Sequence, residues 1–159
     1  MEYQHTPVML DEVLKYLNPQ PGENFIDCTL GGGGYTMAIA KIILPTGKIL
    51  AIDLDELAID NAKIKFKTKN IILVHDNFKN LQAIVDEYFE AGAEFDGIVF
   101  DLGLSSAQLA SGSRGFSFNL PDSPLNMIFG EQTEETAENI INSWSEAELV
   151  RIFKEYGEE

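Results

Sequence analysis

Short hydrophobic runs alternate with longer amphipathic stretches along the first hundred residues. The runs that predict strands occupy residues 25–28, 48–53, 71–74 and 95–101. The stretches around them predict helices, with apolar residues recurring at helical spacing, over residues 9–17, 34–43, 56–68 and 81–91. Strands that alternate with helices are typical of an α/β fold with a parallel sheet.

The chain after residue 104 has a different texture. Residues 102–118 are rich in glycine, serine and leucine and predict a long loop, whereas residues 134–143 and 146–156 predict helices. Ser145 is the expected N-cap of the second helix. We therefore predict a Rossmann-like half-domain over residues 1–104, followed over residues 105–159 by a loop and the start of a helical insertion.

Four consecutive glycines, Gly31 to Gly34, follow the first strand and open a helix. Glycine has no Cβ, so a ligand can approach the backbone closely, and the start of a helix offers unpaired N–H groups. Asp53 ends the second strand 20 residues after Gly33, where an acid accepts hydrogen bonds from a ribose. The pattern predicts a nucleotide-type ligand at this edge of the sheet.

The residues around the glycines favour one cofactor class over another. Tyr35 and the residues after it leave the dinucleotide pattern without its third spaced glycine. Asp27, just before the loop, would repel a pyrophosphate and attract a cationic amino group. S-adenosylmethionine carries such a group and no phosphate. A nicotinamide-dependent oxidoreductase stays as the alternative from another class of enzyme.

Parallel topology predicts where the polar strand ends meet. The ligand crevice of an open parallel sheet lies beyond the carboxyl ends of its strands. We therefore expect Asp27, Asp53, Asp101 and the turn at residues 76–78 to converge there.

Composition limits the function further. The chain has 11 basic and 26 acidic residues, a net charge of -15, which is a poor profile for gripping a phosphate backbone. We expect the lysines at 63, 65, 67 and 69 to serve solubility. Cys28, the one cysteine, excludes an intramolecular disulfide and predicts a small buried filler. The pattern predicts no metal site, no membrane span and no secretory signal, hence a cytoplasmic protein.

A series of motifs runs in order along the chain, at residues 5–10, 27–34, 51–55, 77–78, 101–106, 108–109, 114–118, 124–127 and 156–159. With these motifs the chain resembles the N-terminal half of the RsmH (MraW) family. These are bacterial methyltransferases that modify N4 of a cytidine in the decoding region of 16S ribosomal RNA. The resemblance implies a class I S-adenosylmethionine-dependent fold with an incomplete sheet, and 16S rRNA of the small ribosomal subunit as partner.

The resemblance also implies roles for single residues. The cofactor-binding residues would be Gly33, Gly34, Tyr35, Asp53, Phe78, Asp101 and Gln108. Asp101, or a carbonyl just after it, would be the catalytic acceptor for an N4 hydrogen of cytosine. A cation and aromatic rings suit a base lifted from single-stranded RNA, and they equally suit a covering loop that its aromatic residues anchor. The substrate-binding candidates are therefore Arg114, Phe116, Phe118 and Asn126.

The chain departs from the family pattern at three positions. Tyr35 stands where the family usually has histidine, and Asn126 and Ile128 replace an aspartate and an arginine. Two hypotheses follow, an active rRNA methyltransferase and an inactive remnant that binds S-adenosylmethionine. Family members are also about twice as long, so the fourth strand is expected to be an exposed edge through which the chain self-associates.

Overall fold

The computed structural model describes residues 7–104, 108–109, 114–117, 119, 122–129 and 135–157. The chain divides into two compact units, unit 1 from Met1 to Ser105 and unit 2 from Ser106 to Glu159. This boundary falls one residue after the predicted one.

Unit 1 is built on a parallel sheet of four strands. They are β1 (Phe25–Asp27), β2 (Ile49–Asp53), β3 (Ile71–His75) and β4 (Gly97–Val99), in the spatial order β3-β2-β1-β4. The chain order reverses between β1 and β4, which is the place where ligands bind in open α/β sheets. The predicted parallel sheet is confirmed.

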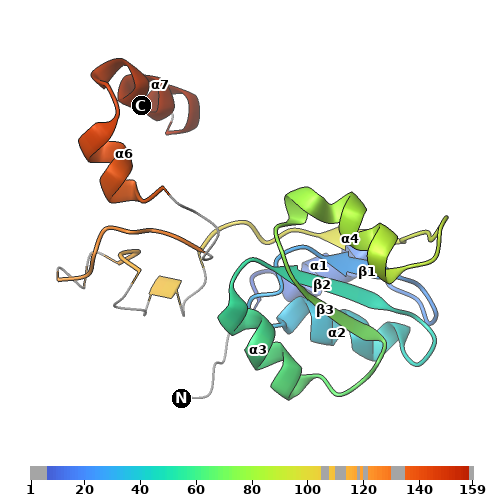
Figure 1. Ribbon diagram of the computed structural model, residues 1–159. Helices are drawn as coiled ribbons and strands as arrows, with labels where there is room; N and C mark the ends of the chain where they lie inside the picture. Colours follow the sequence, from blue (N-terminus) through green and yellow to red (C-terminus); the bar gives the residue numbers. More distant parts are fainter. Residues whose placement is uncertain are drawn as a thin grey trace. The chain divides into compact units, whose positions relative to one another are not determined.

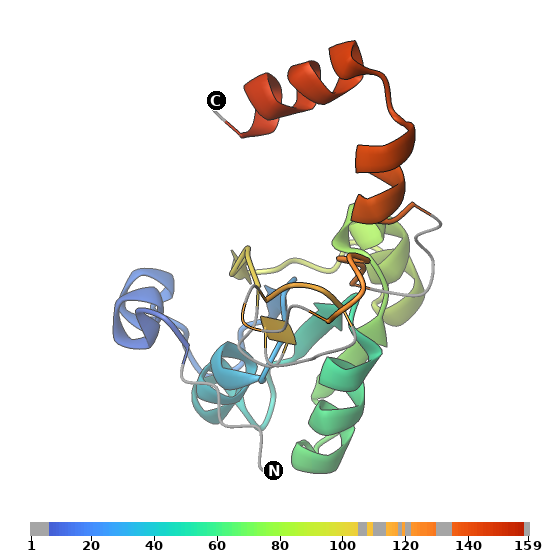
Figure 2. The same cartoon turned by 90° about the vertical axis from the view of Figure 1, so that its left-hand side faces the viewer.

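Helices cover both faces of this sheet (Figures 1 and 2). They are α1 (Leu10–Leu17), α2 (Gly34–Ile43), α3 (Glu56–Lys65) and α4 (Leu81–Tyr88), with a 3₁₀ turn, η1 (Phe78–Asn80), before α4. Ile49 packs with α1 and α2 and Ala51 with α3, whereas Leu50 and Ile52 pack with α4. Because alternate residues of a strand point to opposite faces, both faces of β2 are buried, which explains its uninterrupted apolar sequence.

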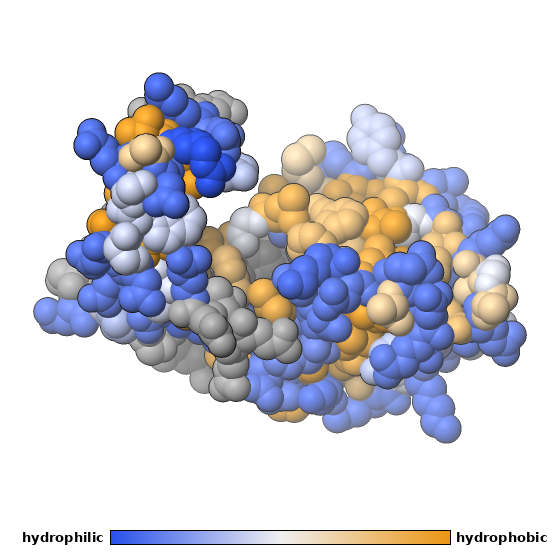
Figure 3. Space-filling view, turned by 45° about the horizontal axis from the view of Figure 1, so that its top comes forward, coloured by the Kyte–Doolittle hydropathy of each residue, from blue (hydrophilic) through white to orange (hydrophobic). Residues whose placement is uncertain are grey.

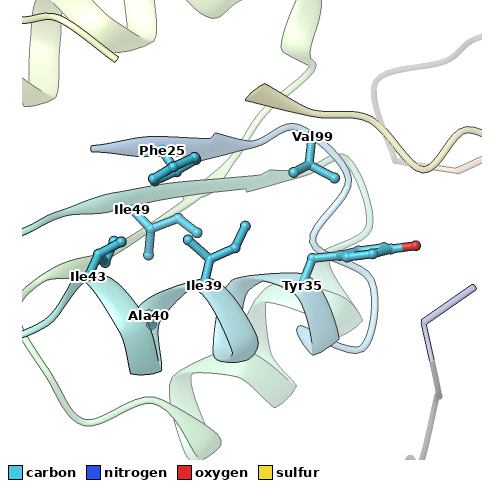
Figure 4. Close-up of a cluster of buried hydrophobic side chains, with 7 residues drawn as sticks. All are labelled: Phe25, Tyr35, Ile39, Ala40, Ile43, Ile49 and Val99. Carbon is cyan, nitrogen blue, oxygen red and sulfur yellow. The ribbon is translucent and has the colours of Figure 1, made fainter. Parts of the chain in front are cut away.

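The core on the α2 face is closely filled. Figure 4 shows the side chains of Ile39 and Ile43 pointing from α2 toward Phe25 and Ile49 of the sheet, and all four are fully buried. Cys28 is buried in the cluster on the α4 face, and burial raises the pKa of its thiol to about 11. It fills space there, as its position in a strand predicted.

Unit 2 contains α6 (Ala137–Ser143) and α7 (Glu146–Tyr156). Ser145 caps α7 in a capping box: its hydroxyl oxygen accepts from the Glu148 N–H, and the Glu148 carboxylate accepts from the Ser145 N–H. The predicted N-cap is therefore confirmed. Among the described residues of this unit only Phe116 is buried, with its ring 5.0 Å from that of Phe129.

Several element ends differ from the prediction. The helix expected over residues 56–68 ends at Lys65, because Phe66 turns to an extended conformation. The helix expected over residues 81–91 ends at Tyr88, and the fourth strand contains three residues rather than seven. That strand is short because only residues from Gly97 to Val99 pair with β1. In the part of the chain that the structure describes, no helix has the length and apolar character of a membrane span.

Candidate functional site

The glycine loop is held to the ends of β1 and β2 by backbone hydrogen bonds. The Leu30 N–H donates to the Ile52 carbonyl at 2.9 Å, and the Gly33 N–H donates to the Leu30 carbonyl at 2.7 Å. Gly31 and Gly33 have positive φ angles of 48° and 75°, a conformation that glycine adopts without strain. The loop therefore has a defined shape at the start of α2.

Two of the glycines also have no room for a side chain. A Cβ on Gly33 would lie 2.8 Å from the Phe66 ring, and one on Gly34 would lie 2.1 Å from Pro7. The loop is thus wedged between the end of α3 and the N-terminal segment. Lys65 strengthens the first of these contacts, because its Nζ lies 3.2 Å from the Gly32 carbonyl. The sequence predicted solubility as the role of this exposed lysine and did not predict this contact.

Asp53 joins β2 to the glycine loop. Its Oδ2 accepts the Gly31 N–H at 2.7 Å and its Oδ1 accepts the Asp55 N–H at 2.9 Å. Partial burial raises the pKa of this carboxyl, and the two N–H donors oppose that rise. A carboxylate has about four acceptor positions. Two oxygens with one donor each therefore retain capacity for the hydroxyls of a ribose.

Asp27 does not have the position expected for it. It is fully buried, its Oδ1 accepts the Thr29 N–H at 3.1 Å, and its Oδ2 accepts the Thr36 hydroxyl at 2.7 Å. The carboxylate therefore ties β1 to the first turn of α2 beneath the loop. The expectation that it directly meets a ligand's amino group was wrong, because the packing of α2 on β1 encloses it.

Tyr35 contributes its backbone rather than its side chain to the loop surface. The ring is buried in the core cluster (Figure 4), and its hydroxyl donates to the Val8 carbonyl. Burial, and then the charges of Asp101 and Asp27, raise the pKa of this phenol. Gly34 and Tyr35 occupy the first helical positions of α2, where N–H groups have no acceptor within the helix.

The chain segments after β3 and β4 lie at the same edge of the sheet as the end of β2. The Asp76 N–H donates to the Asp53 carbonyl at 3.1 Å, which places the turn before Phe78 beside β2. The Phe78 ring is 40% exposed and meets the Phe100 ring edge to face, with centroids 5.5 Å apart. Phe100, which directly follows the last residue of β4, was not predicted as a site residue.

Asp101 follows the end of β4 by two residues, and its side chain is exposed. Its N–H donates to Thr29 Oγ1 at 2.7 Å. This bond lies two residues beyond Asp27 and Val99, the last pair of the β1–β4 ladder. Unit 1 thus brings together the glycine loop, Asp53, Phe78 and Asp101 at one edge of the sheet, as topology predicted. Thr29 was not predicted, because a threonine after a strand gives no distinctive signal.

The remaining predicted residues belong to unit 2. Gln108 lies in a short helical segment, and Phe118 falls outside the described residues. The Arg114 carbonyl accepts the Met127 N–H, and the Asn126 carbonyl accepts the Ala137 N–H. These bonds hold the backbones of two substrate-binding candidates. Phe116 is buried against Phe129, so its ring serves packing here rather than an open stacking surface.

Metal chemistry has no candidate site in the part of the chain that is described. No group of three or more histidine, cysteine, aspartate or glutamate side chains there is placed to hold a metal ion.

The sequence model of the MraW methylase family matches residues 2–159. The chain belongs to the MraW methylase family. One relative, ribosomal RNA small subunit methyltransferase H of Clostridium botulinum (strain Loch Maree / Type A3), is 44% identical over 160 residues, which cover 100% of this chain and 51% of the relative. The protein of that name from Brevibacillus brevis is 41% identical and covered to 50%. The chain spans about half the length of the curated relatives it matches.

A solved structure shares the fold. An rRNA methylase from Streptococcus thermophilus superposes with a TM-score of 0.50 at 20% identity, covering 63% of this chain and 58% of that chain. Together with the observed strand order, this likeness confirms the predicted Rossmann-like fold with an incomplete sheet. Family membership confirms the predicted methyltransferase class and S-adenosylmethionine as the cofactor of the family.

Proposed function

We propose that this chain is the cofactor-binding half of an rRNA methyltransferase, and that the edge of its sheet holds S-adenosylmethionine. The observation that carries the proposal is the bond between the Gly31 N–H and Asp53 Oδ2, which joins the glycine loop and the ribose-binding acid in one site. The target we propose is N4 of a cytidine in the decoding region of 16S rRNA. The names of the relatives support rRNA of the small subunit, and the family motifs support the base and the atom.

The residues present fit the cofactor part by part. Asp53 keeps acceptor capacity for the two ribose hydroxyls. The exposed Phe78 ring, steadied by Phe100, offers an apolar wall for an adenine. The loop at Gly33 and Gly34 has no side chain, and the first N–H groups of α2 suit the methionine carboxylate. When bound, S-adenosylmethionine supplies the methyl group.

Asp101 is the proposed acceptor for a proton from the cytosine amine. The amine lone pair is delocalised into the ring, so an acceptor that draws an N4 hydrogen makes the nitrogen a better nucleophile. The Asp101 side chain is exposed at the crevice, and its backbone is held by Thr29. We propose from the resemblance that Asp101 also contacts the bound cofactor, together with Gln108.

Unit 2 is the proposed substrate side. Arg114 and Asn126 are held at their backbones by hydrogen bonds within the unit, so their side chains have fixed starting points. We propose them, with Phe116 and Phe118, as contacts for the target cytidine. Phe116 would have to leave its contact with Phe129 to stack on a base. A cytoplasmic location, in association with the small ribosomal subunit, is part of the same proposal.

A second function is favoured by the residues at positions 126 and 128. Asn126 and Ile128 replace an acid and a base of the family pattern, and the net charge of -15 opposes binding to an RNA backbone. A chain that binds S-adenosylmethionine and transfers nothing is therefore the alternative. Incubation with small ribosomal subunits, followed by mass spectrometry of N4-methylcytidine, separates the two functions.

Calorimetric titration of S-adenosylmethionine tests the cofactor proposal. We expect binding that weakens about 10- to 100-fold in Asp53→Ala, because the variant loses a charged hydrogen-bond acceptor. Asp53→Asn, which keeps one oxygen for the Gly31 N–H, separates ribose binding from loosening of the loop. Asp60→Ala, on the exposed side of α3 in an ion pair with Lys63, is the matched control. Equal affinity in the wild type and Asp53→Ala, or tighter binding of NADH, would contradict the proposal.

We also propose that unit 1 self-associates through β4. Among the described residues this strand pairs with β1 alone, and Ile98 within it and Phe100 just after it are 45% and 49% exposed. Figure 3 shows a broad hydrophobic area on the visible face of unit 1. Unpaired backbone groups beside exposed apolar side chains favour strand addition. Sedimentation velocity should show a dimer that Ile98→Lys converts to monomer and that Leu57→Lys, on exposed α3, leaves intact. A monomeric wild type would refute this.

A further inference from the structure

We propose that Thr29 is a positioning residue, whose hydroxyl oxygen holds the backbone of Asp101 and so sets where the Asp101 carboxylate stands in the crevice. The inference rests on the proposed function, because it gives Asp101 its position for the reaction proposed above. It assigns a role in that reaction to a residue that does not itself touch the reacting atoms.

The bond lies where the sheet ends. The ladder between β1 and β4 closes with Asp27 opposite Val99, and the Cys28 N–H still donates to the Val99 carbonyl at 2.9 Å. Beyond that point the two strands are no longer paired. The chain after β1 continues into the glycine loop, and the chain after β4 continues through residues 100–104. The Asp101 N–H to Thr29 Oγ1 distance of 2.7 Å is a hydrogen bond of good length across this opening.

Within the described part of the chain, the bond to Thr29 is the one hydrogen bond that Asp101 makes. The four residues from Asp101 to Leu104 are all exposed, and Leu102 is 71% exposed. A Cβ on Gly103 would meet no atom within 4 Å, so the segment is not packed at that point. Without an acceptor from Thr29, the Asp101 N–H would turn to water. The carboxylate would then occupy a wider range of positions.

Thr29 itself is firmly anchored. Its N–H donates to Asp27 Oδ1 at 3.1 Å, while Asp27 Oδ2 accepts the hydroxyl of the fully buried Thr36 at 2.7 Å. A line of hydrogen bonds thus runs from α2 through β1 to the end of β4. In this arrangement the buried Asp27 carboxylate fixes Thr29, and Thr29 in turn fixes the backbone of Asp101.

The test separates positioning from general support of the fold. Thr29→Val keeps the branched shape and removes the acceptor, whereas Thr29→Ser keeps the oxygen and loses only a methyl group. We expect S-adenosylmethionine affinity to fall about 3- to 10-fold in Thr29→Val and to stay within about twofold in Thr29→Ser. Thr29→Ala, which removes the oxygen without adding bulk, serves as a second variant if the valine disturbs the loop.

A double-mutant cycle shows whether the effect passes through Asp101. In an Asp101→Ala background the affinity loss from Thr29→Val should disappear, because no carboxylate remains to be positioned. The Asp101 amide in ¹⁵N NMR spectra should move upfield and exchange faster with solvent in Thr29→Val, and Thr29→Ser should restore it. Full additivity of the two mutations, or no rescue by serine, would overturn the inference.

Failure of the proposed function gives a different result. If the wild-type chain binds no S-adenosylmethionine, the cofactor proposal fails, and the Asp101 amide then decides the positioning proposal. Unchanged shift and exchange in Thr29→Val would overturn positioning in that case. Binding by the wild type with equal affinity in Thr29→Val would overturn positioning and leave the cofactor proposal standing.

Discussion

Different interactions stabilise the interior of unit 1 and the interior of unit 2. Unit 1 has three clusters of buried side chains, and its site depends on hydrogen bonds between residues far apart in sequence, such as Gly31 to Asp53 and Asp101 to Thr29. In unit 2 only Phe116 is buried among the described residues, and the ends of α6 and α7 are set by local caps. A cofactor site with fixed geometry therefore needs the burial of unit 1, whereas unit 2 relies mainly on short-range signals.

The largest expected contrast comes from truncating one apolar side chain in each unit. Ile39→Ala, at a fully buried position of α2, should lower the free energy of unfolding by about 2 to 5 kcal/mol. Phe153→Ala, at a position of α7 that is 55% exposed, should cost less than about 1 kcal/mol. Urea unfolding followed by circular dichroism measures both. Equal losses would show that unit 2 is as tightly packed as unit 1.

The single tryptophan sharpens this measurement. Trp144 is in unit 2, where its Nε1 donates to Glu135, so its fluorescence reports on that unit. Ile39→Ala should shift the circular dichroism transition and leave the fluorescence transition in place. A common shift of both signals would mean that the units unfold together.

The next largest effect is a pH dependence that belongs to unit 1. Burial, with a smaller addition from the Asp53 charge, raises the pKa of Asp27 from 3.8 to about 6. The folded chain therefore holds this proton more tightly than the unfolded chain. The resulting stabilisation is full below about pH 4 and is lost as pH rises through about 6.

Asp27→Asn removes this titration and keeps an oxygen for the Thr29 N–H. Relative to the wild type, its free energy of unfolding should increase by on the order of 3 kcal/mol between about pH 4 and 7. Urea titrations across that range measure the difference. Parallel pH profiles of the two proteins would contradict the assignment.

Glycine substitutions give a smaller contrast within unit 1. Gly33→Ala places a methyl group in a positive-φ position and against the Phe66 ring, for an expected cost of about 2 to 3 kcal/mol. Gly92→Ala is the matched control, with a φ of 84° and no atom within 4 Å, and should cost about 1 kcal/mol. Thermal unfolding compares the two variants. Equal melting temperatures would remove the argument that the loop is wedged against α3.

The smallest expected effect tests the local caps of unit 2. Ser145→Ala removes the acceptor for the Glu148 N–H and should cost about 1 kcal/mol, seen as lost helical signal and altered Trp144 fluorescence. Ser143→Ala, at the last residue of α6, removes only a hydroxyl that donates to the Asn139 carbonyl and should change little. Cofactor binding should be unaffected by both. Any loss of binding in Ser145→Ala would link the cap to the cofactor site.

Short-range sequence patterns correctly predicted the positions of three strands and the start of one helix. The hydrophobic runs located β1, β2 and β3 to within one residue, and the Ser145 cap located the start of α7. The edge strand β4 was overestimated, because an apolar run shows that residues are hydrophobic but does not show how many find a pairing partner. The same limit applies to Phe116, because its aromatic character did not show that the ring packs against Phe129.

The candidate site shows the same division. Gly33, Gly34 and Asp53 were identified from spacing, since the chain between a glycine loop and the next strand end has a nearly constant length. Spacing did not predict the burial of Asp27 or the bond from Lys65 to Gly32. Each depends on how a helix packs against the sheet or the loop, which is a tertiary contact.

The sequence by itself determined the alternation of strands and helices, the family and the position of the glycine loop between β1 and α2. These depend on periodicity and on the special backbone freedom of glycine, both of which are local properties of the chain. Only the tertiary structure decided that Asp27 lies beneath the loop while Asp101 stands at its rim, held by Thr29. Asp27 ends β1 and Asp101 follows β4 by two residues, so their sequence settings differ little, but burial by α2 gives them opposite environments.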